Sequence, residues 1–222
     1  GTLGYQVSGK KVKTLNTTPD IISLSNILNN AINEKCEFAV LEVSSHAIQQ
    51  KRIENIDFDL RILTNVSRDH LDYHKTIKNY QNTKKQFFLS EKRTKAIINI
   101  DDFVGRKIIN EGDLKNHQFI SYAIDRDADL KVKNIVYKNN KTIFDFLWEK
   151  NPYQIKTNIF GKHNIYNLLS VIASLLNYEF PMGMIIEAIE NLESIAGRNE
   201  VVHHNDNGTP QIIIDYAHTP DA

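Results

Sequence analysis

The chain has 222 residues, of which 41% are hydrophobic and 24% charged, so it is long enough to bury one sizeable core. Its 27 Lys and Arg residues balance 27 Asp and Glu residues, which argues against nucleic acid or an anionic membrane surface as a partner. No run approaches the roughly 20 apolar residues of a membrane span, and a signal-peptide core is missing from the N-terminal residues. With a single cysteine, Cys36, the composition predicts a cytoplasmic globular protein.

Helical and strand patterns alternate along the chain. The first helix is expected to begin at Thr18 and Pro19, which form an N-cap and N1 pair, and to run to about Glu34. Several later apolar runs show no polar alternation, which is typical of strands covered on both faces. We therefore expect an α/β fold, a mostly parallel, doubly wound sheet with flanking helices. The expected strands are 38–43, 58–65, 96–100, 118–123 and 211–217, and the further helices are 76–90, 101–110, 164–177 and one beginning at Pro181.

Residues 128–160 break this rhythm. They alternate with period two and contain a turn-like Lys-Asn-Asn-Lys run at 138–141. This pattern predicts a small antiparallel layer beside the main sheet.

Polar residues follow three of the expected strands, where open α/β sheets bind their ligands. Each group has a simpler interpretation as a helix cap, for instance Ser44 or Ser45 for a short helix at 45–50 and Asp69 for one at 70–74. Glu42 is harder to explain in this way, because a carboxylate at the end of a buried strand needs a cation or several donors. The three groups are Glu42, Ser44, Ser45 and His46; Thr64, Asn65, Ser67, Arg68, Asp69 and His70; and Asp215, Tyr216 and His218.

Two metal interpretations follow from the histidines. Glu42 and His70 could form a pair of metal ligands. Alternatively, His70 and His74 stand four residues apart, as two zinc ligands on one helix face would. The zinc alternative lacks a third strong ligand at motif spacing.

Three further positions leave a structural and a functional interpretation open. Lys84 and its neighbour Lys85 lie on an amphipathic helix and could be a solvated basic face. Asn164 and Asn167 could cap a helix or read the edge of a purine. Arg198 follows a glycine and could pair with a surface carboxylate or with a phosphate. From the residues alone we expect a nucleotide- or metal-dependent α/β enzyme.

Five motifs, taken in order, resemble the Mur ligases: EVSSHAIQQKR, TNVSRDHLDYHKTIKNYQNTKKQFF, GKHNIYNLLSVIA, GRNEVV and IIDYAHTPDA. The residues of these motifs most resemble the branch of the family that adds the third residue of the peptidoglycan stem peptide. The likeness covers almost the whole chain outside 101–160. It implies a central ATP-binding domain at 1–214 that lacks its first strand and phosphate loop, followed at 215–222 by the start of a truncated C-terminal domain.

The resemblance also implies roles for individual residues. Glu42 and His70 would bind magnesium, as two ions, together with Lys84 carried as a carbamate. The muramoyl-peptide substrate, UDP-MurNAc-L-Ala-D-Glu, would contact residues of the first half of the chain, and ATP would contact residues of the second half. The expected substrate residues are Asn16, Thr17, Thr18, Ser44, Gln50 and Arg52, and the expected ATP residues are Asn164, Asn167, Arg198 and Asp215.

The implied reaction is ATP-dependent amide-bond formation through an acyl phosphate, with an amino acid as the incoming amine. Folylpolyglutamate synthase and cyanophycin synthetase share this fold and chemistry and are alternatives. So is a non-catalytic nucleotide-sugar-binding module. We expect the segment alone to be inactive and the longer parent to be a monomeric ligase.

Overall fold

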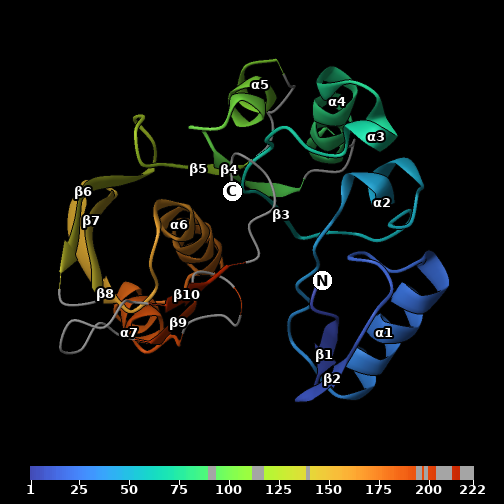
Figure 1. The fold of residues 1–222 in the computed structure, drawn as a ribbon, viewed down its shortest axis with the longest axis horizontal. Helices are drawn as coiled ribbons and strands as arrows, with labels where there is room; N and C mark the ends of the chain where they lie inside the picture. The colour runs from blue at the N-terminus through green and yellow to red at the C-terminus, as the bar shows by residue number, and fades with distance from the viewer. Residues whose placement is uncertain are drawn as a thin grey trace. The chain divides into compact units, whose positions relative to one another are not determined.

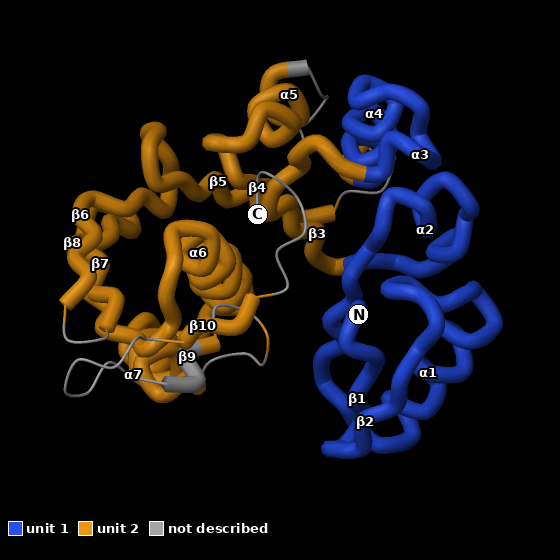
Figure 2. The backbone as a smooth tube through the Cα atoms, in the orientation of Figure 1, with its two compact units in different colours: residues 1–58, 70–87 blue, residues 59–69, 88–222 orange. Residues whose placement is uncertain are grey.

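The computed structural model describes residues 1–89, 94–111, 118–138, 141–193, 197, 200–203 and 212–215. The chain divides into two compact units (Figure 2). Unit 1 comprises residues 1–58 and 70–87, and unit 2 comprises residues 59–69 and 88–222. Within the described ranges, no helix is long and apolar enough to cross a membrane.

Unit 1 opens with a β-hairpin that the sequence patterns did not predict. Its strands pair Tyr5 with Val12 and Val7 with Lys10. The turn between them uses Ser8 and Gly9, both at positive φ (46° and 82°), a conformation that glycine adopts without strain. Helices make up most of the rest of unit 1. Its elements are β1 (Tyr5–Val7), β2 (Lys10–Val12), α1 (Ile21–Asn33), α2 (Ser45–Gln49), α3 (Leu71–His74) and α4 (Ile77–Phe88), whose last residue falls in unit 2.

The first helix begins later than predicted, because Thr18 is not its cap. The N-cap is Asp20, whose carboxylate accepts hydrogen bonds from the backbone of Ile22 (3.1 Å) and Ser23 (2.9 Å). These bonds lower the pKa of Asp20, with the backbone bond from Ser23 the largest cause. Thr18 is fully buried and uses its hydroxyl in a tertiary contact described below.

The strand expected at 38–43 is not formed, which corrects the prediction. The segment has no ladder partner among the described residues, and it exposes 53% of Phe38 and 96% of Val40. Apolar residues favour a strand only where a neighbouring segment pairs the backbone N–H and C=O groups. Here the last residues of the segment are bonded by side chains instead.

Unit 2 is built on a six-stranded sheet in the order β3-β4-β5-β6-β7-β8 (Figure 1). The pairs from β3 to β6 are parallel, and those from β6 to β8 are antiparallel. The mostly parallel sheet predicted from unalternated apolar runs is thus confirmed. The strands are β3 (Leu60–Leu63), β4 (Lys95–Asn99), β5 (Phe119–Ala123), β6 (Leu130–Lys138), β7 (Lys141–Trp148) and β8 (Asn151–Thr157).

The period-two segment at 128–160 forms the antiparallel strands β6 to β8, but these extend the main sheet rather than forming a separate layer. The β6–β7 hairpin pairs Lys138 with Lys141, as the turn signal indicated. The two asparagines between them lie outside the described residues. Parallel β5–β6 pairing is short, with only Tyr122 and Ala123 in register, so the antiparallel part continues an edge of the parallel part.

Helices cover both sides of the parallel strands, with α5 and α6 on opposite sides of β4 and β5 (Figure 1). Helix α6 supplies a buried stripe at i, i+4, i+7 and i+8, formed by Ile165, Leu169, Ile172 and Ala173. This stripe packs with Tyr122 and with residues of β6, β7 and β8 into one apolar cluster. The helices of unit 2 are α5 (Phe103–Glu111), α6 (Lys162–Asn177) and α7 (Met182–Glu190).

The last expected strand is present as β10 (Ile212–Ile214), but it does not join the main sheet. It pairs antiparallel with β9 (Glu200–His203) in a two-stranded sheet, with a register shift between Ile212 and Ile213. All three residues of β10 are exposed.

Truncation of Leu169 to Ala tests the core. Leu169 is fully buried, so we expect a loss of about 2–5 kcal/mol in the free energy of unfolding from lost burial and the cavity left behind. Val171→Ala, on the exposed side of the same helix with 42% of its surface accessible, should change it by no more than about 0.5 kcal/mol. Urea unfolding monitored by circular dichroism measures both. Equal losses would contradict this packing.

Candidate functional site

Thr18 bonds the segment that leads into α2. Its hydroxyl donates to the carbonyl of Glu42 (2.7 Å) and accepts from the backbone N–H of Ser44 (3.1 Å). Ser44 in turn caps α2 by accepting from the N–H of Ala47 (3.2 Å), which confirms the predicted cap. Thr18 and Ser44, both expected to bind substrate, therefore have structural roles within the protein.

Glu42 has the hydrogen-bond donors that its position demands. Its Oε2 accepts from the backbone N–H of Thr2 (3.0 Å) and from the Thr2 hydroxyl (2.9 Å). The Thr2 hydroxyl also lies 3.2 Å from that of Thr17. Next to it, Asn16 is exposed and its carbonyl accepts from Thr14. Thr17, expected to contact substrate, is thus connected to Glu42 through Thr2, and Asn16 is its neighbour in the sequence.

Lys84 reaches the same segment from α4. Its Nζ donates to the carbonyl of Val43 at 2.9 Å, next to Glu42 in the chain. Burial lowers the pKa of the Lys84 ammonium, because a charge is less well solvated inside the protein. Lys84 is therefore not part of a solvated basic face.

Gln50 and Arg52 form one hydrogen-bonded group after α2. Gln50 Oε1 accepts from Nε of Arg52 at 2.9 Å and from its Nη2 at 2.5 Å, and Arg52 Nη1 donates to the carbonyl of Thr18 at 2.9 Å. Gln50 Nε2 donates to the hydroxyl of Tyr73 at 3.1 Å. The two residues predicted to hold substrate are therefore oriented together.

His70 and His74 each contact other side chains of unit 1. His70 lies in the left-handed region (φ 55°) and is the N-cap residue of α3, without a side-chain cap hydrogen bond, so Asp69 is not the N-cap that was predicted. The His70 ring meets His46 edge-on, with centroids 5.0 Å apart. His74 is only 4% exposed and shares a 2.8 Å hydrogen bond with the Ser45 hydroxyl. Burial lowers the pKa of His74, and the neighbouring imidazoles lower it further.

This environment does not support the zinc alternative. Across the described ranges, no three His, Cys, Asp or Glu side chains group closely enough to hold a metal ion. His74 is instead a hydrogen-bonded residue of the interior of unit 1.

In unit 2, Asn164 and Asn167 bond each other at the start of α6. Asn167 Nδ2 donates to Asn164 Oδ1 (3.2 Å), and Asn164 Nδ2 donates to the carbonyl of Phe160 (2.6 Å). Neither side chain caps the helix. The N-cap is Gly161, at φ 97°, which corrects the capping alternative.

The carboxyl ends of β3, β4 and β5 are joined by three residues that sequence reasoning missed. Asn99 donates to the carbonyl of Thr64, and Asp102 accepts from the backbone N–H of Val66 and caps α5. Asp101 Oδ2 accepts from the N–H of Ile124 and Asp125 and from the hydroxyl of Tyr166. The signal was the run Asn-Ile-Asp-Asp directly after a buried strand.

The hydrogen bonds to Asp101 decide its ionisation. Burial by itself would raise the pKa of Asp101, but the bonds from the backbone of Asp125 and Ile124 and from Tyr166 together hold it below its usual value. Burial and the same bond raise the pKa of the Tyr166 hydroxyl. Asp101 is thus an ionised acceptor and Tyr166 a neutral donor.

The remaining predicted ATP residues are less fully described. Arg198 lies outside the described residues, and so does part of the GRNEVV motif that contains it. Asp215 follows β10 and is exposed.

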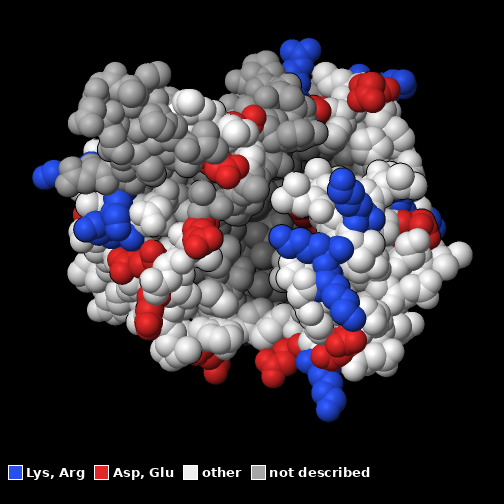
Figure 3. Space-filling view, turned by 60° about the horizontal axis from the view of Figure 1, so that its bottom comes forward, with Lys and Arg blue, Asp and Glu red and all other residues white. Residues whose placement is uncertain are grey.

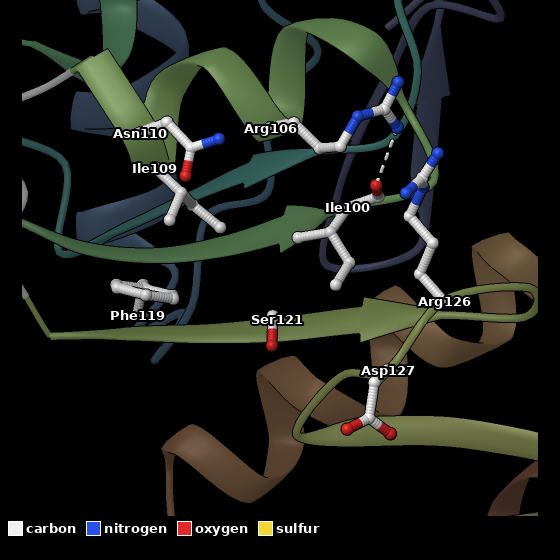
Figure 4. A pocket seen from close by; sticks show the side chains of 8 residues that line it. All are labelled: Ile100, Arg106, Ile109, Asn110, Phe119, Ser121, Arg126 and Asp127. Atoms are coloured by element: carbon white, nitrogen blue, oxygen red, sulfur yellow. Dashed lines mark hydrogen bonds between the residues drawn. The ribbon is translucent and has the colours of Figure 1, made fainter.

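A pocket of about 410 Å³ lies in unit 2 between α5 and β5 (Figure 4). The guanidinium groups of Arg106 and Arg126 lie at the same end of it, and Arg106 donates to the carbonyl of Ile100 at 2.9 Å. No residue predicted from the motifs lines it. Its lining residues are Ile100, Arg106, Ile109, Asn110, Phe119, Ser121, Arg126 and Asp127.

Basic and acidic side chains both occur on the face drawn in Figure 3. This agrees with the balanced composition. An anionic ligand would therefore be held by particular side chains rather than by a general positive field.

Comparison with known proteins gives a consistent result. The family profile of the Mur ligase middle domain matches residues 1–175. Two curated relatives are UDP-N-acetylmuramoyl-L-alanyl-D-glutamate--2,6-diaminopimelate ligase 1 of Clostridium acetobutylicum, 36% identical over 221 residues, and the corresponding ligase of Clostridium botulinum, 37% identical over 221 residues. Each match covers 100% of this chain and 45% of the relative. The chain thus spans less than half the length of these relatives.

Solved structures agree. A UDP-N-acetylmuramoyl-L-alanyl-D-glutamate--2,6-diaminopimelate ligase superposes with a TM-score of 0.83 at 26% identity, covering 100% of this chain and 45% of that one. L. casei FPGS, at 16% identity and a TM-score of 0.61, covers 90% of this chain and 54% of its own, and shows the fold alone.

The Asp101 hydrogen bonds predict a pH-dependent stability. Because its pKa is lowered in the folded state, the ionised side chain stabilises the protein above the ordinary aspartate pKa of 3.8. Replacing Asp101 by Asn should cost about 1–3 kcal/mol at pH 7, and the gap from wild type should narrow as the pH falls below that value. Thermal unfolding between pH 7 and pH 3 measures it.

Asp127→Asn is the matched control, because its side chain is 97% exposed and pairs only with Lys131 in the part of the chain described. We expect no measurable gap there. A gap for Asp101→Asn that stays constant over the whole pH range would contradict an ionised acceptor.

Proposed function

Because the chain belongs to the Mur ligase family, we propose that its parent protein is an ATP-dependent ligase of peptidoglycan synthesis. The parent would add the third amino acid to UDP-MurNAc-L-Ala-D-Glu. The observation that carries this proposal is the convergence in unit 1 of motif residues from three segments: Lys84 bonds the residue after Glu42, and Gln50 and Arg52 connect to Tyr73. The match to relatives with this printed activity over the whole chain supports it.

We propose 2,6-diaminopimelate as the added amino acid, because the two relatives are named for it. The reaction would take place in the cytoplasm, and the parent would act as a monomer. ATP and the UDP-linked peptide would be the other two substrates.

The donor chemistry of Glu42 suits magnesium. Mg²⁺ favours oxygen donors and is often bound through one or two protein carboxylates together with substrate phosphates. Glu42 is exposed, and within the described part of the chain both of its hydrogen bonds fall on Oε2, so Oε1 can serve a cation. We propose that Glu42, His70 and a carbamylated Lys84 hold two magnesium ions. These ions would neutralise charge on the phosphates.

The environment of Lys84 suits carbamylation. Its lowered pKa raises the fraction of neutral amine, the form that attacks carbon dioxide. The new N–C bond forms, one proton leaves the nitrogen, and the product is a carbamate anion. A cation that would repel magnesium thereby becomes an oxygen ligand.

Substrate binding would use the exposed groups around this centre. Asn16 and Thr17 would contact the UDP-sugar, and Gln50 and Arg52 would hold the peptide carboxylates, for which a guanidinium is well suited. Thr18 and Ser44 would act mainly by fixing the segment between them.

The nucleotide would be contacted from unit 2. Asn164 and Asn167 would lie near adenine and Asp215 near the ribose, and Arg198 would neutralise the transferring phosphoryl group. The Asn164–Phe160 hydrogen bond would orient the asparagine pair.

The chemistry would have two steps. An oxygen of the D-glutamyl γ-carboxylate attacks the γ-phosphorus of ATP, and ADP leaves. The amine nitrogen then attacks the acyl carbon, the new amide bond forms, and phosphate leaves while the nitrogen loses a proton. Two anions meet in the first step, so the cationic residues and the alignment of the substrates contribute most of the catalysis.

A folylpolyglutamate-synthase-like activity is the second candidate, favoured only by the shared fold. A non-catalytic nucleotide-sugar-binding module is a third candidate.

The full-length protein, given ATP, Mg²⁺ and UDP-MurNAc-L-Ala-D-Glu, should form an amide with diaminopimelate. Mass spectrometry of the product, with lysine and folate substrates as competitors, tests this. Amide formation on folate alone would favour the second candidate, and binding without turnover the third.

Lys84→Ala in the full-length protein should reduce ligation at least about 100-fold, since it removes a proposed metal ligand. Partial recovery on adding a short-chain carboxylate would follow if the lost group is a carbamate. Lys85→Ala is the matched control and should retain most of the activity. Unchanged turnover of Lys84→Ala would mean that this lysine is not the modified one.

A further inference from the structure

Unit 1 contains a cluster of aromatic and imidazole rings where α2, α3 and α4 meet. His46 of α2 lies at its centre, with ring centroids 4.1 Å from Tyr73, 5.0 Å from His70 and 5.7 Å from His74. Tyr80 of α4 closes the other side, 5.4 Å from His74 and 5.7 Å from His70. His70 is thus held between a ring of α2 and a ring of α4.

Tyr73 makes contacts of two different kinds. Its ring packs on His46 at an interplanar angle of 40°, whereas its hydroxyl accepts a hydrogen bond from Nε2 of Gln50 at 3.1 Å. The hydroxyl and the Arg52 guanidinium therefore together fix which way the Gln50 amide faces. With Nε2 directed at Tyr73, the opposite atom, Oε1, is presented to Arg52.

The Gln50 amide in turn sets the plane of a guanidinium. Oε1 accepts from two nitrogens of Arg52, and the third nitrogen donates to the carbonyl of Thr18. A planar guanidinium with all three nitrogens directed in this way has one orientation. Tyr73 supports that orientation through its hydrogen bond to the same amide.

We propose that Tyr73 and His46 are positioning residues that connect the Gln50–Arg52 pair to His70. This inference rests on the proposed function, in which Arg52 binds the peptide substrate and His70 a metal ion. Tyr73 would increase substrate affinity through its hydroxyl. The His46 ring would hold Tyr73, and through it Arg52, and would also hold the His70 ring in place.

If Tyr73 served folding alone, losing its hydroxyl would lower the melting temperature and leave substrate affinity unchanged. The position of its hydrogen bond argues against this. Gln50 is exposed and Tyr73 half-buried, so the bond between them contributes little to folding, because water replaces it when it is lost. Its loss should therefore leave the melting temperature nearly unchanged. It should nevertheless loosen the Gln50 amide, which accepts from two nitrogens of Arg52.

The test uses the full-length protein with Tyr73→Phe, which removes the hydroxyl and keeps the ring. We expect the KM for UDP-MurNAc-L-Ala-D-Glu to rise roughly 2- to 10-fold, the range for one lost hydrogen bond, with kcat within about twofold of wild type. The magnesium concentration for half-maximal rate should not change. His46→Ala should raise both that concentration and the KM.

Tyr137→Phe is the matched control. Tyr137 lies on β6 in unit 2 and is 52% exposed, so the same chemical change there should alter neither constant. Calorimetric titration of the UDP-linked peptide gives a readout independent of turnover. A weaker Kd for Tyr73→Phe supports the proposal even if the wild-type protein forms no amide, in which case only the proposed function fails. Equal KM and equal Kd for wild type and Tyr73→Phe would overturn the proposal.

Discussion

The hydroxyl of Thr18 is the contact on which the organisation of unit 1 depends. Among the described residues no strand pairs with residues 42–44, yet Thr18 accepts the N–H of Ser44 and donates to the carbonyl of Glu42. Lys84 donates a hydrogen bond to the carbonyl of Val43, the residue between them. Side chains thus perform the pairing that a neighbouring strand performs elsewhere, and they fix a carboxylate, a buried amine and the start of α2 in one arrangement. Because Thr18 is fully buried, water cannot substitute for its bonds.

The fold was predictable from sequence where a residue pattern reports burial directly. The unalternated runs became β3, β4 and β5, and the period-two segment became three antiparallel strands. The wrong predictions concern features that depend on contacts with distant parts of the chain. Residues 38–43 have the composition of a strand but no described partner, and Thr18 has the position of a cap but is used in a tertiary bond, so Asp20 caps α1 instead. Local propensity predicts neither the absence of a strand partner nor the use of Thr18 in a tertiary hydrogen bond.

The candidate site shows the same division. Motif resemblance indicated Glu42, Gln50, Arg52 and Lys84 as candidates, and these lie within one compact unit. Arg52 bonds Gln50 and the Thr18 carbonyl, Thr18 bonds the Glu42 carbonyl, and Lys84 bonds the carbonyl of Val43. The resemblance did not indicate the residues that support these side chains, because a residue such as Tyr73 has no distinctive chemistry until its contacts are seen. Asn99, Asp101 and Asp102 were missed for a related reason, since an Asn-Ile-Asp-Asp run is equally typical of an ordinary turn.

The Asp101 carboxylate has a consequence for how this protein could evolve. One oxygen accepts from two successive N–H groups of the β5–β6 connection and from Tyr166, which lies beside the Asn164–Asn167 pair on α6. Surface loops ordinarily tolerate insertions and deletions, but a change of length here would displace a tyrosine from its acceptor and tilt the helix that presents the two asparagines. We therefore expect natural variants to keep the length of this loop even where they exchange its residues.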